Sequence, residues 1–262
     1  MDISRVIERV ASDIVQQDDV ARLDRPSPAR VARMMELLRE VIFAHHYLGC
    51  CSAMVVGQKI REVFRLLEAE TSSTVAINFI ESLPEIRNLL FTDVKAVMAG
   101  DPAATSPDEV ILCYPAITAM LHHRVAHSLY SQNVLILARM ISEIAHSATG
   151  IDIHPGATIG EYFSIDHGTG VVVGQTTIIG SHVRLYQGVT LGARSFISGE
   201  NGELLNTARH PIIEDDVVIY SNTSVLGRIT IGRGSVIGGN VWLTRDVPRG
   251  SKITQSSLKI SK

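Results

Sequence analysis

The chain has 262 residues, 45% of them hydrophobic, and a formal net charge of −3 at pH 7. This length allows one large domain or two smaller ones, and the charge gives no electrostatic reason to expect nucleic acid or an anionic membrane as a partner. No apolar run approaches the roughly 18 residues that span a bilayer, the charged start MDISRVIERVASD does not resemble a signal peptide, and three cysteines fit a reducing cytoplasm.

The first part of the chain predicts helices, because its apolar residues recur at every third or fourth position. The clearest segments are residues 30–47, 57–70 and 75–83. Pro28 stands near the start of the first segment, where proline is well tolerated in a helix. These segments predict an α-helical N-terminal domain that covers residues 1–149.

Two further helical patterns close this domain. After a turn at Gly100–Pro102, the start signal Ser106–Asp108 opens a long helical pattern that runs through Tyr130. Asn133 is expected to cap the N-terminus of the last helix, and Gly150 to end it.

From Ile153 onward the aliphatic residues recur at every sixth position. The pattern comprises Ile153, Ile159, Ile165 and Val171, then Val173, Ile179, Leu185 and Leu191, and finally Ile213, Ile219, Val225, Ile231, Ile237 and Leu243. A period of six fits neither a helix nor an ordinary strand, and it predicts a parallel β-helix of hexapeptide repeats. The aliphatic residues fill the interior of the prism, and glycines form many of its corners. We expect this domain to span residues 150–250, with a short tail at 251–262.

The repeat is broken twice, and each break carries a histidine. The first is a two-residue slip around His167, and the second is an insertion over residues 193–211 that ends in Arg209 and His210. Loops inserted into a rigid repeat commonly carry function. The two breaks are therefore the first places to expect an active site.

His167 is a candidate general base, because imidazole titrates near neutral pH. Asp152 lies 15 residues earlier, close to the about 18 residues of one coil of three hexapeptides. Coil stacking is therefore expected to place Asp152 beside His167, where it would fix the tautomer of the ring. The guanidinium of Arg209 is suited to a substrate carboxylate.

Four motifs carry a resemblance to a known family. DIHPGATIG, IDHGTGVVVG, GVTLG and RHP occur in this order and spacing, and they resemble the serine acetyltransferases of cysteine biosynthesis over roughly residues 100–250. The resemblance implies a left-handed β-helix and the transfer of an acetyl group from acetyl-CoA to the hydroxyl of L-serine. It implies no metal.

The resemblance also implies a role for individual residues. His167 would be the general base and Asp152 the residue that orients it. The acceptor would be bound by Asp101 and Asp166 at its ammonium group, by Arg209 at its carboxylate, and by His210 in the same site. The CoA contacts carried over by position are Gly192, Ala193, Ser221 and Gly239. One departure lies beside this site, because Gln175 stands where relatives usually have glutamate.

For the assembly, the resemblance implies trimers, often paired into hexamers through the helical domain. The active site would lie between neighbouring subunits, so that His167 and His210 come from different chains. L-Cysteine is implied as a possible feedback inhibitor. The tail at 258–262 lacks the terminal isoleucine by which many relatives dock into cysteine synthase, and that association stays open.

Three other functions remain alternatives. One is a hexapeptide acetyltransferase that acts on another hydroxyl, in homoserine or a sugar. An enzyme for a sugar or an antibiotic would use a similar histidine, but it would lack the helical N-terminal half and the Asp101 and Arg209 pair that suits a zwitterion. A β-helical metalloenzyme of the carbonic anhydrase type would need three histidines that converge on zinc, and the histidines of the β-half do not show that spacing. The third alternative is a scaffold or regulatory protein without activity.

Overall fold

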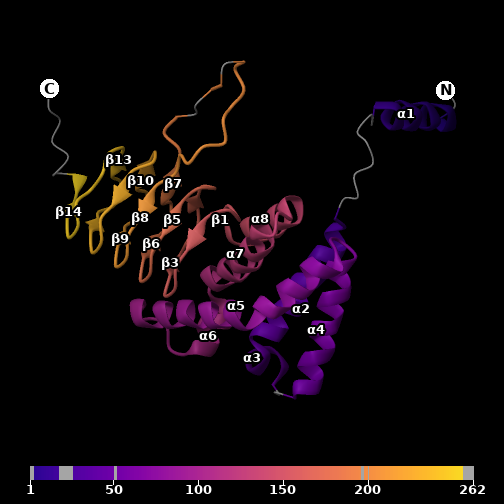
Figure 1. The fold of residues 1–262 in the computed structure, drawn as a ribbon, viewed down its shortest axis with the longest axis horizontal. Helices are drawn as coiled ribbons and strands as arrows, with labels where there is room; N and C mark the ends of the chain where they lie inside the picture. The colour runs from indigo at the N-terminus through magenta and orange to yellow at the C-terminus, as the bar shows by residue number, and fades with distance from the viewer. Residues whose placement is uncertain (1–2, 18–25, 50–51, 196–197, 200, 256–262) are drawn as a thin grey trace.

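The computed structural model describes residues 3–17, 26–49, 52–195, 198–199 and 201–255. Helices occupy the first part of the chain and short parallel strands the second (Figure 1). The helices are α1 (Ile3–Gln17), α2 (Pro28–Ile42), α3 (Ala44–Leu48), α4 (Ala53–Glu68), α5 (Ser73–Gly100), α6 (Pro107–Cys113), α7 (Pro115–Ser131) and α8 (Leu135–Thr149). Within the described ranges, no helix is long and apolar enough to cross a membrane.

Three details of the helical half differ from the sequence prediction. The helix expected over residues 30–47 is divided at Phe43 into α2 and α3. The single helix expected from Ser106 to Tyr130 is two helices, because Tyr114 adopts an extended conformation (φ −81°, ψ 124°) before Pro115. A residue that precedes proline is driven out of the helical region by contact with the proline ring. Asn133 does not cap the last helix, since Val134 is the N-cap and Asn133 has φ 64° in the left-handed region.

The second half is a left-handed parallel β-helix with three faces. The first face contains β1 (Asp152–Ile153), β4 (Val172–Val173), β7 (Thr190–Gly192), β10 (Ser224–Leu226) and β13 (Trp242–Leu243). The second contains β2 (Thr158–Ile159), β5 (Ile178–Ile179), β8 (Ile212–Ile213) and β11 (Thr230–Ile231). The third contains β3 (Ser164–Asp166), β6 (Arg184–Tyr186), β9 (Val218–Ile219), β12 (Val236–Ile237) and β14 (Lys252–Ile253).

The predicted hexapeptide positions form the core of the prism. Leu185, Leu191 and Ile219 have no exposed surface, and the other aliphatic repeat residues are buried beside them. Strand β14 pairs with β12, so the prism continues past the predicted boundary at residue 250. The tail at 258–262 lies outside the described residues.

A buried ion pair joins the helical half to the prism. Arg124 on α7 and Asp93 on α5 are joined by hydrogen bonds of 2.8 Å, and Arg124 also donates to the carbonyl oxygen of Gly160 at 2.9 Å. Asp93 accepts in turn from the backbone N–H of Phe163 at 3.1 Å. Because both side chains are almost fully buried, removal of either one would leave an uncompensated charge. The pair therefore fixes α5 and α7 against the β2–β3 corner.

Candidate active site

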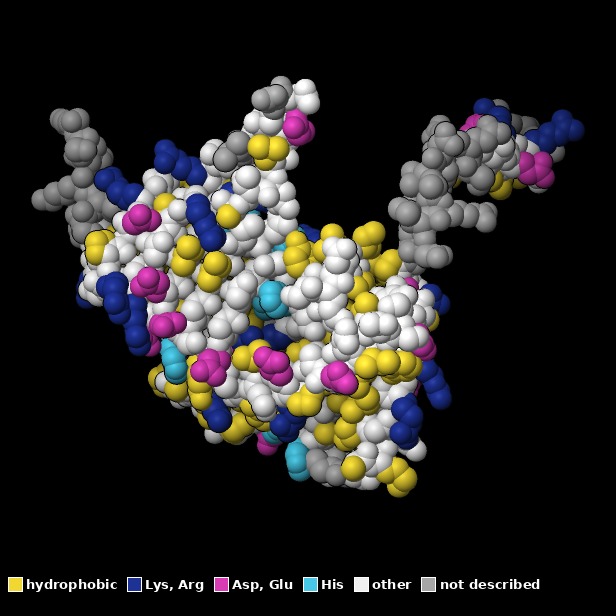
Figure 2. All heavy atoms as spheres, in the orientation of Figure 1, with side chains coloured by type: hydrophobic (Ala, Val, Ile, Leu, Met, Phe, Trp, Pro, Cys, Tyr) yellow, Lys and Arg dark blue, Asp and Glu magenta, His cyan; other side chains and the backbone are white. Residues whose placement is uncertain are grey.

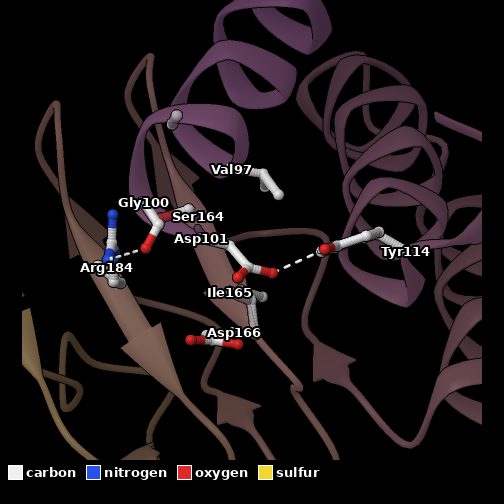
Figure 3. Close-up of a pocket in the computed structure, with 9 residues that line it drawn as sticks. Val97, Gly100, Asp101, Tyr114, Ser164, Ile165, Asp166 and Arg184 are labelled. Atoms are coloured by element: carbon white, nitrogen blue, oxygen red, sulfur yellow. Dashed lines mark hydrogen bonds between the residues drawn. The ribbon is translucent and has the colours of Figure 1, made fainter. Parts of the chain in front are cut away.

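The carboxylate of Asp101 lies at the junction of the two halves (Figure 3). Asp101 is the C-cap of α5, and its Oδ2 accepts a hydrogen bond of 2.6 Å from the hydroxyl of Tyr114. Asp166, at the end of β3, and Arg184, on β6, line the same small pocket. The structure thus brings together Asp101 and Asp166, two carboxylates that the sequence places 65 positions apart.

His167 follows Asp166 at the corner between the third and first faces, which we call the base corner. Its backbone has φ 58°, in the left-handed region, and its side chain is 76% exposed. Its Nε2 lies 3.6 Å from Oδ1 of Asp166. Gly168, with φ 93°, has no space for a side chain, since a Cβ there would lie 2.5 Å from Ile151. The glycine after His167 lets the chain turn sharply and presents the imidazole to the outside.

The stacking expected for Asp152 is not what the coil register gives. Asp152 pairs with Val172, 20 residues later, because the two-residue slip lengthens this coil. Its carboxylate lies 3.9 Å from Arg139 on α8, and His167 lies instead within ion-pair distance of Asp166. The carboxylate near the imidazole is therefore that of Asp166, the preceding residue in the chain, and no ion pair joins the described side chains of Asp152 and His167.

The insertion returns to the prism at Arg209 and His210, at the corner between the first and second faces, which we call the arginine corner. The Nδ1 of His210 accepts from the backbone N–H of Thr176 at 3.1 Å. Its ring lies directly on Gly174, where a Cβ would be 1.9 Å from the ring. Only glycine at this position leaves room for the histidine.

The Arg209 side chain is held at the same corner. Its Nη2 donates to Oε1 of Gln175 at 2.9 Å, and Nε2 of Gln175 donates to the hydroxyl of Tyr130 at 2.9 Å. Gln175, the departure seen in the sequence, is therefore a partner of Arg209. Nη1 of Arg209 donates to Oδ1 of Asn206 at 3.0 Å and to the carbonyl oxygen of Thr207 at 3.2 Å, and among the described residues its buried Nε has no hydrogen-bond partner.

The surroundings of His210 favour its neutral form. Burial, and to a lesser extent the positive charges of Arg209 and Arg228, lower the pKa of His210 to about 4. His210 is therefore neutral at pH 7, a state in which one ring nitrogen donates and the other accepts. With Nδ1 accepting from Thr176, Nε2 carries the proton and is a hydrogen-bond donor.

The four predicted CoA residues divide between the same two corners. Ser221 follows β9 and Gly239 follows β12, so both lie on the base corner in later coils. A Cβ on Gly239 would lie 3.1 Å from the carbonyl oxygen of Ser221, and the two residues are therefore stacked closely. Gly192 and Ala193 lie at the end of β7, on the arginine corner.

Sequence reasoning missed Tyr114, Arg184 and Tyr130. Tyr114 and Tyr130 belong to apolar helical patterns, in which a tyrosine is an ordinary core residue. Arg184 occupies an outward position of the hexapeptide repeat, where charged residues are common. No signal in the sequence distinguishes these three residues, because their partners lie on distant elements.

One group of side chains has the geometry of a metal site within the described part of the chain. The ligand atoms of Glu143, His146 and Asp152 lie within 4.8 Å of one another. Arg139 contacts both Glu143 and Asp152 and already supplies a positive charge there. The histidines of the β-half do not form such a group among the described residues of the single chain.

Comparisons with known proteins show that the chain is similar to serine acetyltransferases. The family model for the bacterial transferase hexapeptide (six repeats) matches residues 210–245. The chain is 57% identical over 205 residues to the plasmid-encoded serine acetyltransferase of Synechococcus elongatus, covering 78% of this chain and 64% of that relative. It is 48% identical to the serine acetyltransferase of Bacillus licheniformis, covering 63% of this chain and 73% of the relative.

A solved structure agrees with these sequence matches. Serine acetyltransferase isoform 3 from Entamoeba histolytica, in complex with cysteine, superposes with a TM-score of 0.74 at 36% identity. The match covers 87% of this chain and 84% of the other. The similarity therefore includes the helical half as well as the prism.

Proposed function

Because the chain belongs to the serine acetyltransferase family, we propose that it transfers the acetyl group of acetyl-CoA to the hydroxyl of L-serine, giving O-acetylserine and CoA. The observation that carries the proposal is the exposed imidazole of His167 beside the carboxylates of Asp166 and Asp101. A base next to two anions suits an acceptor that has both a hydroxyl and an ammonium group. Three cysteines in the whole chain fit a cytoplasmic location.

The reaction needs one proton acceptor and one stabiliser of negative charge. His167 takes the proton of the serine hydroxyl while the oxygen attacks the carbonyl carbon of the thioester. The carbonyl oxygen becomes an oxyanion, and we expect backbone N–H groups of the site to stabilise it. When the intermediate collapses, the C–S bond breaks and the thiolate of CoA takes the proton from the imidazolium. No acyl-enzyme and no metal is required.

Binding of serine needs groups from both the base corner and the arginine corner. Asp101 and Asp166 attract the ammonium group, and Arg209 offers its guanidinium to the carboxylate. His210, as a neutral donor, lines the same site. These groups lie at corners separated by the whole first face of one prism, which is too far for one amino acid to bridge within a chain.

We therefore propose that the site forms where the base corner of one chain meets the arginine corner of the next. The CoA residues support this arrangement, because they divide between the same two corners. A head-to-tail interface that closes makes a ring, and the resemblance to the family implies a ring of three copies. Pairing of two trimers through the helical domain would give a hexamer.

Two further roles are part of the proposal. The family resemblance assigns Asp152 to the orientation of His167, and in the single chain its carboxylate lies 3.9 Å from Arg139. L-Cysteine is proposed as a competing ligand, since it has the ammonium and carboxylate groups of serine with a thiol in place of the hydroxyl. The relative from Entamoeba histolytica was solved with cysteine bound.

A comparison of acceptors tests the proposed function. Release of CoA from acetyl-CoA is measured with L-serine, L-homoserine and a galactoside as acceptors. We expect rapid release with serine and much slower release with the other two, because only an α-amino acid satisfies both charged groups, and serine alone has a hydroxyl at the right length. Preference for the galactoside would instead support a sugar acetyltransferase, and release with none of them a protein without this activity.

Replacement of Arg209 tests the carboxylate subsite. We expect Arg209→Ala to raise the KM for serine about 10- to 100-fold, because a hydrogen bond to a charged group is lost, and to change the KM for acetyl-CoA far less. Steady-state kinetics with each substrate varied in turn makes the comparison. Arg61→Ala, on the surface of α4, is the matched control. Equal increases in both KM values would show that Arg209 serves CoA.

A further inference from the structure

Both carboxylate oxygens of Asp101 have a fixed partner. Oδ1 accepts from the backbone N–H of Ala103 at 2.8 Å, and Oδ2 accepts from the hydroxyl of Tyr114 at 2.6 Å. Figure 3 shows Tyr114 reaching the carboxylate from the helical side of the pocket. With two hydrogen bonds in place, the carboxylate has one orientation, and its remaining lone pairs keep a fixed direction.

The backbone on the other side of Asp101 is tied to the prism. Arg184, on β6, donates from Nη1 to the carbonyl oxygen of Gly100 at 2.8 Å. A Cβ on Gly100 would lie 1.6 Å from Nη2 of Arg184, so the guanidinium packs directly on the glycine. This carbonyl belongs to the last turn of α5, where a cation is favoured by the helix dipole. Arg184 therefore fixes the end of the helix against the strand next to β3.

These two contacts matter because the two acidic groups of the pocket come from different halves of the molecule. Asp101 caps a helix, whereas Asp166 ends strand β3. An ammonium group bound by both needs two donor–acceptor distances near 2.8 Å at once. Small movements of α5 relative to the prism would lengthen one of them. Groups that hold a binding carboxylate in place before the ligand arrives improve affinity by lowering the cost of ordering it.

We propose that Tyr114 and Arg184 are positioning residues that hold Asp101 in register with Asp166 for the ammonium group of the acceptor. Tyr114 fixes the carboxylate and Arg184 fixes the backbone that precedes it. The proposal rests on the proposed function, in which Asp101 and Asp166 bind that ammonium group.

The charges around Asp101 support a specific role for Tyr114. The groups that face Asp101 are Tyr114 and Glu109 from the helical side, Asp166 and His167 from the base corner, and Arg184 from β6. The hydrogen bond from Tyr114 is the largest cause that lowers the pKa of Asp101, followed by the N–H of Ala103, and the charges of His167 and Arg184 add smaller contributions. The same hydrogen bond raises the pKa of Tyr114 to about 12, so the hydroxyl remains a donor throughout the working range.

The sign of the pH effect follows from these directions. Asp101 binds an ammonium group when it is ionised, and a lowered pKa keeps it ionised as the pH falls. Without the hydroxyl of Tyr114 the pKa of Asp101 rises. As the pH is lowered, the variant is therefore expected to lose acceptor binding first, at a pH where the wild type still binds.

The experiment uses Tyr114→Phe in the full chain. We expect the KM for serine to rise about tenfold, as for the loss of one hydrogen bond to a charged group, with kcat and the KM for acetyl-CoA nearly unchanged. The loss of L-serine binding on acidification, measured by titration calorimetry without acetyl-CoA so that the general base takes no part, should begin at a higher pH in the variant. Tyr47→Phe is the matched control, because Tyr47 is a partly buried tyrosine of α3 that packs against the helical core away from the pocket.

Two further variants keep the test decisive. Arg184→Met should raise the KM for serine, and Arg184→Lys should restore part of the loss because a cation again faces the end of α5. In an Asp101→Asn background, Tyr114→Phe should add little, since residues that act through one another are not additive. Additive effects, equal changes for both substrates, or an unmoved pH profile would overturn the proposal. A wild-type protein that does not use serine would overturn the proposed function instead.

Discussion

Replacement of His167 by alanine is expected to lower turnover by a factor of about 10² to 10⁴, the usual contribution of a positioned general base. The serine hydroxyl has an ordinary pKa far above neutrality, so attack on the thioester needs a group that removes the proton as the bond forms. His167 is exposed at a break in the repeat, with a carboxylate 3.6 Å from its Nε2. The measurement is kcat for CoA release at saturating serine and acetyl-CoA.

His182→Ala is the matched control for this variant. His182 has φ 58°, the same left-handed backbone conformation as His167, and it also occupies a corner of the prism. Both substitutions therefore impose a similar backbone cost, but His182 stacks on Tyr162 at a different corner. Circular dichroism and thermal melting establish that both variants are folded. Near-normal turnover in folded His167→Ala would remove His167 from the role of base.

Activity is expected to return when two inactive variants are mixed. In the proposed trimer, chains with His167→Ala and chains with His210→Ala each lack one half of every site. In a mixed trimer, a His210→Ala chain supplies an intact base corner and a His167→Ala chain an intact arginine corner. A boundary at which these two corners meet has both histidines. The opposite order at a boundary lacks both. Unfolding the two variants together and refolding them should therefore give an activity well above that of either variant alone.

The controls for the mixing experiment are refolded wild type and the refolded double variant His167→Ala/His210→Ala. The wild type establishes the yield of refolding, and the double variant mixed with either single variant should stay inactive. If the mixture of single variants stays inactive while the wild type recovers, the two histidines act within one chain or one of them is not required. A monomer in sedimentation analysis would contradict the shared site independently of activity.

The hexapeptide spacing was enough to predict the architecture of the β-half. Each aliphatic repeat position, from Ile153 to Leu243, is a buried residue of the prism. The reason is that a period of six returns one inward-pointing side chain to every face of the β-helix. The helical half was also predictable as helix from its periodicity. His167 and Asp166 are adjacent in the chain, so the sequence alone places these two side chains close together.

The remaining features depend on which elements meet in space. The slip that marks His167 also shifts the register to 20 residues, so Asp152 pairs with Val172 rather than with the histidine. The slip itself is visible in the periodicity, but the side chains that surround Asp152 and His167 depend on how the coils stack and on where α8 packs. The hydrogen bond from Tyr114 to Asp101 and the contact of Arg184 with Gly100 join elements that are 13 and 84 residues apart. The tertiary structure alone decided these contacts, because a pattern of hydrophobic residues specifies what is buried but not which polar side chains face one another across an interface.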